Sequence, residues 1–212
     1  KPYPDSLVQV KLSGDVYAGG YAGGRTMRQS ASVLALKLEG QEEKRENKKT
    51  VICTSLRDDR GYRYRHYLSW EEGKKSLLSF TEFENASGEA VGIEMLSSFS
   101  LSGISPFVGA DESGFLKLHR IRSVWSMEGR TESHLLEDLQ LEPSWGGHAV
   151  RCERFGQVGS MPVNGYFPYA VVEDTKSGIL WGAQLMHNAS WQMEVYRRGD
   201  DAALSGGLAD YD

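Results

Sequence analysis

The feature that most constrains the fold of this chain is the alternation of apolar and polar residues along much of its length. Successive side chains of a β-strand point to opposite faces, so a period of two indicates half-buried strands. No segment predicts a long helix, because Gly73 interrupts Glu71 to Leu78 and Thr131 to Leu141 offers at most a few turns. The alternating positions are Val8, Val10, Leu12; Leu34, Leu36, Leu38; Val91, Ile93, Met95; Ile179, Trp181, Ala183, Leu185; Met193 and Val195.

Turn-forming residues separate the alternating segments. They occur at Leu38–Gly40, Asn85–Gly88 and Asp111–Gly114, where Gly, Asn and Asp accept backbone conformations that other residues resist. The clearest hairpin joins Ala170–Asp174 to Ile179–Trp181, and Gly178 suits a positive φ in the turn between them. Many short strands with many turns predict a mainly β protein, a large antiparallel sandwich with few short helices.

Some segments carry their own predictions. The charged run from Gln41 to Lys49 has no apolar face and is interpreted as a solvated loop, and Ser205–Leu208 resembles a turn. Trp125 and Trp181 stand in strand-like patterns that predict core positions, and Gly19–Gly24 is interpreted as a tight loop. A length of 212 residues with no linker-like shift in composition fits a single domain over residues 1–212.

Composition excludes several classes of partner. The formal net charge is -5, so the chain has no basic surplus for nucleic acid or an anionic membrane. No stretch reaches the roughly 18 apolar residues that span a bilayer. The start, Lys1–Pro4, has no apolar signal core, and we expect a cytoplasmic rather than a secreted protein. The two cysteines, Cys53 and Cys152, predict neither a disulfide framework nor a zinc site.

Motifs of catalysis and cofactor binding are missing from the sequence. It contains no GxSxG elbow, HExxH, P-loop or dinucleotide fingerprint, so we predict no bound cofactor and no metal. Acidic residues are numerous, but sequence alone does not bring a glycosidase pair of carboxylates together. Five Trp and ten Tyr are compatible with sugar binding, because the apolar face of a pyranose stacks on an aromatic ring.

The second half of the chain contains an ordered series of motifs: Glu137–Trp145, Glu153–Pro162, Gly165–Pro168, Val172–Thr175, Trp181–Leu185, Ser190–Val195 and Ser205–Asp210. In this order they resemble the N-terminal β-sandwich domain of family 36 α-galactosidases, with a looser match at Tyr21–Ser30. The resemblance implies a large galactose-mutarotase-like supersandwich beside a catalytic (β/α)₈ barrel, which is absent from this chain. It also implies retaining hydrolysis of terminal α-galactosyl or α-N-acetylgalactosaminyl groups by the parent enzyme, and a tendency to homo-oligomers.

The resemblance assigns roles to residues of this chain. A sandwich loop places an aromatic residue over the sugar pocket, and the matching position is Trp191, with His187, Asn188 and Ser190 beside it as substrate-binding candidates. The chain departs from the family pattern at His187 and at the alanine before Ser190. Trp191 also begins a strand, so a core position is the alternative. A second candidate set, the interface with the barrel, comprises Arg154, Gln157, Asn164 and Tyr166. None of these residues is predicted to be catalytic.

Three functions remain open on the sequence. The first is a non-catalytic domain of an α-galactosidase-like enzyme that packs on the barrel in cis and helps to wall the pocket for an α-galactoside. The second is a free-standing carbohydrate-binding module, which sugar affinity without a barrel would reveal. The third is a mutarotase-like enzyme with a His and a carboxylate at the anomeric centre, although no pair among the five His has suitable neighbours.

Overall fold

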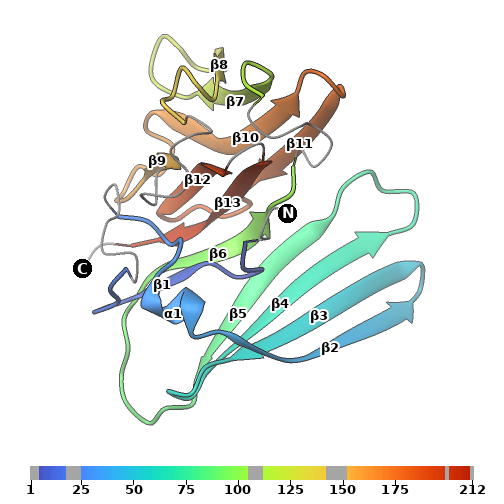
Figure 1. Cartoon of the computed structure of the whole chain (residues 1–212), viewed down its shortest axis with the longest axis vertical. Coiled ribbons are helices and arrows are strands. Elements are labelled where there is room, and N and C mark those ends of the chain that lie inside the picture. The colour runs from blue at the N-terminus through green and yellow to red at the C-terminus, as the bar shows by residue number, and fades with distance from the viewer. Residues whose placement is uncertain (1–4, 18–24, 105–111, 142–151, 199–200, 211–212) are drawn as a thin grey trace.

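The computed structural model describes residues 5–17, 25–104, 112–141, 152–198 and 201–210, and it is built almost entirely of antiparallel strands (Figure 1). Its single helix within those ranges is α1 (Ala31–Leu34). The prediction of a mainly β, antiparallel fold with few short helices is confirmed. The strands are β1 (Val10–Leu12), β2 (Lys37–Glu46), β3 (Lys49–Arg57), β4 (Tyr62–Glu71), β5 (Leu78–Asn85), β6 (Ile93–Leu101), β7 (Leu116–Arg122), β8 (Thr131–Leu135), β9 (Cys152–Gln157), β10 (Tyr166–Asp174), β11 (Ile179–Gln184), β12 (Trp191–Arg198) and β13 (Asp201–Ala209).

Two of the three sheets form a sandwich. The five-stranded sheet has the order β1-β6-β13-β12-β9, and the four-stranded sheet opposite it has the order β11-β10-β7-β8. The core between them contains Leu116 and Leu118 from β7, Val172 from β10, and Met193 and Val195 from β12, all fully buried. Burying these side chains is the main favourable term for this part of the fold, at about 25 cal/mol per Å² of apolar surface.

The third sheet, β2-β3-β4-β5, extends away from the sandwich (Figure 1). Near its base it packs on β1 and α1 through a second core that includes Leu56, Tyr64, Val10 and Val33. The Ser79 hydroxyl of β5 donates to the carbonyl of Ser98 in β6, at 2.8 Å. The β2–β3 turn, at the outer end of the sheet, lies far from the sandwich (Figure 1).

The predicted hairpin around residues 170–181 is confirmed. Asp174 pairs with Ile179 at the start of the β10–β11 ladder, and Gly178 has a φ of 71° in the turn. The Asp174 carboxylate accepts from the backbone N–H groups of Lys176 and Ser177, at 2.9 and 3.0 Å, and holds the turn closed.

The charged run predicted as a solvated loop is instead the hairpin of β2 and β3. Its residues show no apolar period because β2 is an edge strand that is exposed along nearly its whole length. Charged side chains on an edge strand discourage pairing with other chains. The predicted turn at Leu38–Gly40 is a register shift inside β2, where the ladder skips between Leu38 and Gly40.

Other sequence predictions fail for nonlocal reasons. Residues 205–208, predicted as a turn, lie within β13, where Gly206 and Gly207 allow neighbouring strands to approach closely. The Leu34 to Leu38 segment divides between α1 and β2. The predicted core positions of Trp125 and Trp181 are wrong, because the two side chains are 95% and 40% exposed. No helix in the described parts of the chain has the length and apolar character needed to cross a bilayer.

Candidate functional site

Three loops meet at one end of the sandwich, which we call the loop end. They are the β7–β8 loop (residues 123–130), the β9–β10 loop (residues 158–165) and the β11–β12 loop (residues 185–190). The strand register brings them together, because Gln157 at the end of β9 pairs with Trp191 at the start of β12. In the opposite sheet, Arg122 at the end of β7 pairs with Tyr166 at the start of β10.

Hydrogen bonds tie the three loops to one another. The backbone N–H of Gly159 donates to the Ser190 hydroxyl at 3.0 Å, and the N–H of Ser123 donates to the carbonyl of Gly165 at 3.1 Å. The end of β13 joins the same group, since the N–H of Ala209 donates to the carbonyl of Ser190 at 3.2 Å. These contacts hold the loop end as one surface.

Trp191 lies in the core beneath this surface. Its side chain is 1% exposed and stands edge-on to Phe155, with ring centroids 6.0 Å apart. The indole N–H donates to the carbonyl of Pro162 at 2.5 Å, so the ring supports the β9–β10 loop from inside. The ring has no exposed face on which a sugar can stack in this conformation, and the structure agrees with the alternative core position for Trp191.

The other substrate-binding candidates lie on the surface above Trp191. His187 and Asn188 are exposed on the β11–β12 loop, and Ser190 is half-buried where its hydroxyl accepts from Gly159. These three residues are therefore accessible at or near the surface of the loop end.

The four interface candidates divide between two places. Gln157, Asn164 and Tyr166 lie at or beside the loop end, with Asn164 exposed and its N–H donating to the carbonyl of Met161 at 3.0 Å. Arg154 belongs to the other face of the five-stranded sheet, where its guanidinium donates to the carbonyl of Arg25 at 3.0 Å.

Tyr166 is part of a charged and aromatic cluster that closes the core at the loop end. The Arg120 guanidinium lies 4.7 Å from the Tyr166 ring centroid and 5.1 Å from that of Phe155, and Arg122 lies 4.3 Å from Tyr166. The Tyr166 hydroxyl donates to Glu132 at 3.2 Å. Burial raises the pKa of the Tyr166 hydroxyl, against the lowering effect of Arg120.

Glu132 is the acidic centre of this cluster. Burial alone would raise the pKa of its carboxyl, but hydrogen bonds from His134 and Arg122 and the charge of Arg120 lower the pKa overall. His134 lies 3.1 Å from the Glu132 carboxylate. With its partners already satisfied inside the protein, Glu132 serves to fix Tyr166 and the two arginines rather than to receive a ligand.

A second polar group on the outer face of the β10–β7–β8 sheet has the residue types of a hydrolase triad. His119 bridges Ser133, with Nδ1 2.7 Å from the hydroxyl oxygen, and Glu173, with Nε2 2.9 Å from the carboxylate. The three residues lie on neighbouring strands, and the strand N–H groups lie in the plane of the sheet rather than above it. An oxyanion would find no backbone donors above this face, so we interpret the group as a surface hydrogen-bond chain.

Sequence reasoning missed the exposed apolar side chains of the loop end. Trp125 is 95% exposed, Met186 84%, Met161 66% and Val163 43%. Met161 and Val163 share the β9–β10 loop, and Trp125 and Met186 lie in the other two loops. Their exposure depends on the fold rather than on a local pattern. Among the described residues, no three His, Cys, Asp or Glu side chains come together as a metal site requires.

Comparison with known proteins gives a result at the level of fold. Neither a protein-family model nor a curated protein sequence matches the chain significantly. Among solved structures, the family GH36 α-galactosidase AgaA from Geobacillus stearothermophilus is 14% identical with a TM-score of 0.57, and the match covers 98% of this chain and 27% of that one. A variant of AgaA in complex with stachyose is 15% identical, with a TM-score of 0.57 and the same coverage.

The α-galactosidase from Lactobacillus brevis is also similar, at 12% identity with a TM-score of 0.63, over 98% of this chain and 26% of that enzyme. The matched region takes in nearly all of this chain in each case. The chain has the fold of one part of them and spans about a quarter of their length.

Proposed function

We propose that this chain is the non-catalytic β-sandwich of a retaining α-galactosidase-like enzyme, where it packs on a catalytic barrel in cis and helps to wall the sugar pocket. The observation that carries the proposal is the coverage of the structural match, 98% of this chain against 27% of AgaA. The rest of AgaA has no counterpart in this chain.

The loop end supplies a surface suited to such packing. Trp125, Met161 and Met186 project from three loops that are hydrogen-bonded together, and exposed apolar side chains gathered on one surface mark interaction sites. Aromatic residues and Met are enriched in the buried centres of protein interfaces.

Within this proposal, the exposed residues His187 and Asn188 form the part of the loop end that faces the sugar. Trp191 acts from below, because its indole N–H holds the Pro162 carbonyl and its ring fills the core. Gln157, Asn164 and Tyr166 belong to the packing surface or its support.

The experiment measures hydrolysis of a chromogenic α-galactoside by the isolated 212-residue chain and by the full-length product of the parent gene. We expect activity in the full-length protein alone. Met186→Asp should lower that activity at least tenfold by placing a charge in the packing surface, whereas Leu180→Asp is the matched control. Leu180 is 59% exposed on β11 near the opposite, hairpin end of the same sheet.

Two results would contradict the proposal. Hydrolysis by the isolated chain would show that the sandwich carries its own catalytic group. Equal activity of the Met186 and Leu180 variants in the full-length protein would show that the loop end is not the packing surface. Circular dichroism of both variants checks that a fall in activity does not reflect unfolding.

A further inference from the structure

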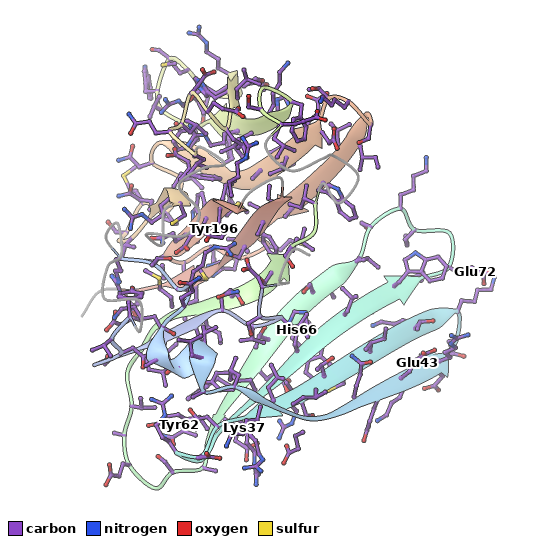
Figure 2. The ribbon with its side chains drawn as sticks, in the orientation of Figure 1. Lys37, Glu43, Tyr62, His66, Glu72 and Tyr196 are labelled. Atoms are coloured by element: carbon purple, nitrogen blue, oxygen red, sulfur yellow. The ribbon has the colours of Figure 1, made fainter. Side chains whose placement is uncertain are left out.

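The strongest unassigned site lies at the far end of the β2–β5 sheet, remote from the sandwich core. Figure 2 shows Glu43 and Glu72 at this outer end of the sheet. A shallow groove of about 440 Å³ lies there, lined by the β2–β3 turn and by the end of β4. Trp70 forms one wall and is 41% exposed, whereas Trp side chains are highly buried on average.

The groove is held by two turns that are bonded to each other. Asn47 and Lys48 have φ values of 49° and 67°, which is the backbone of a tight hairpin turn that matches the twist of the strands. The N–H of Glu72 donates to the carbonyl of Lys48 at 2.8 Å and joins the β2–β3 turn to the β4–β5 turn. The walls are therefore set before any ligand arrives.

The indole of Trp70 is fixed in orientation. Its N–H donates to the carbonyl of Lys74 at 2.9 Å, so this polar edge is already satisfied. The ring offers a ligand its face and its apolar edge. Thr50 lies directly beside Trp70 in the ladder, and Arg45 lies beside Thr50, so the three form one row across the sheet. The Trp70 ring is therefore a platform beside a hydroxyl and a guanidinium.

The charges around the groove are nearly balanced. Its lining contains three basic residues, Arg45, Lys48 and Lys49, and two acidic ones, Glu46 and Glu72. Glu46 and Lys49 face each other in the ladder, and Arg45 forms an ion pair with Glu43. This mixture gives neither the basic cluster that selects phosphates nor the acidic cage that selects cations. It suits a neutral ligand with many hydroxyl groups, which needs both donors and acceptors.

We propose that this groove binds a neutral oligosaccharide, with one pyranose ring stacked on Trp70 and its hydroxyl groups bonded to Arg45, Thr50 and Glu72. The apolar face of a pyranose matches the face of an indole, and the surrounding polar groups satisfy the hydroxyls. Because the groove is open and has one aromatic platform, the dissociation constant is on the order of 1 mM. The site is separate from the loop end and does not depend on the proposed function.

The test is saturation-transfer NMR on the 212-residue chain with stachyose and with maltotetraose, followed by titration to obtain the dissociation constant. We expect binding by the unmodified chain, at least a tenfold weakening in Trp70→Ala, and a smaller loss in Arg45→Ala. Trp70→Phe should retain part of the affinity because it keeps an apolar ring. Trp125→Ala removes an even more exposed Trp at the loop end and should bind as the unmodified chain does.

Three outcomes would overturn the proposal. The first is the absence of binding to both sugars at 20-fold above the expected constant, and the second is equal binding by the Trp70→Ala and unmodified chains. The third is a loss in Trp125→Ala instead, which would place sugar binding at the loop end. Circular dichroism and thermal unfolding of each variant separate loss of the site from loss of the fold. Because no hydrolysis is measured, failure here leaves the test of the proposed function unaffected.

Discussion

Glu194 anchors a strap that crosses the outer face of the five-stranded sheet, and its replacement gives a sharp test of the fold. Residues 25–30 form the strap. The Glu194 side chain is fully buried, and its carboxylate accepts from the Thr26 hydroxyl at 2.5 Å, from the Met27 N–H at 3.0 Å and from Gln192 at 2.7 Å. The Arg28 guanidinium lies 3.7 Å away and balances the charge.

The loss of stability expected for Glu194→Gln follows from these contacts. Glutamine keeps one acceptor oxygen but turns an amide N–H₂ group toward donors that now have no acceptor. An unsatisfied buried donor costs about 1–3 kcal/mol, and weaker, uncharged hydrogen bonds at the remaining oxygen add to this. Arg28 retains Asp5 as a partner, so its charge is not left alone. We expect a loss of about 3 kcal/mol, which lowers the Tm by about 6–12 °C for a domain of this size.

Urea unfolding followed by Trp fluorescence measures the free energy of unfolding. Limited trypsin digestion measures how accessible the strap is to cleavage. Cleavage after Arg25 and Arg28 should become faster in Glu194→Gln because the strap loses its anchor. The control is Glu84→Gln, whose side chain is 39% exposed and pairs with Arg65 on the β2–β5 sheet; it should cost less than about 1 kcal/mol. A Glu194→Gln protein within 1 kcal/mol of the unmodified chain, with unchanged cleavage, would refute this reasoning.

Two further predictions test the third sheet and the close approach of strands. Gly207→Ala should lower the free energy of unfolding in urea by about 3 kcal/mol or more, because the new Cβ would lie 2.0 Å from the carbonyl oxygen of Leu96. The control, Gly40→Ala, should change it by less than about 0.5 kcal/mol, because no atom lies within 4 Å of the added Cβ. Equal effects of the two substitutions would contradict the close packing at Gly207. Burial lowers the pKa of His66 in the folded chain. The contribution of the neutral imidazole to stability is therefore complete above the unfolded pKa of about 6.5 and falls as the pH drops below it. Between pH 7.5 and 5.5, the free energy of unfolding in urea should fall less for His66→Gln than for the unmodified chain.

Local patterns predicted the parts of the fold whose causes are local. The β10–β11 hairpin is readable from sequence because Gly178 and Asp174 close the turn within five residues. The run from Gln41 to Lys49 was not readable as strands, because an edge strand exposed on both faces leaves no apolar period. Gly206 and Gly207 looked like a turn, but their small size serves the packing of β13 against β6 and β12.

The buried polar contacts also could not be predicted from the sequence. Glu194 stands in an alternating strand at a position that predicts solvent, yet a strap from residues 25–30, about 168 positions earlier in the chain, covers it. Cys152 shares this environment, where burial and the neighbouring Glu194 raise the pKa of its thiol to about 12. Such contacts depend on how distant segments cross, and no local window contains that information.

The burial of Trp191 changes how the proposed pocket wall should be dissected. Removing a fully buried Trp costs about 3–5 kcal/mol through the cavity that it leaves. Its loss would also release the Pro162 carbonyl that holds the β9–β10 loop. A fall in activity of a Trp191→Ala enzyme would therefore report the support of the loop as much as contact with a sugar. His187 and Asn188 are exposed, so replacing them leaves the core intact. A rise in KM confined to these two variants, with unchanged Tm, is the result that distinguishes a pocket wall from a supporting core.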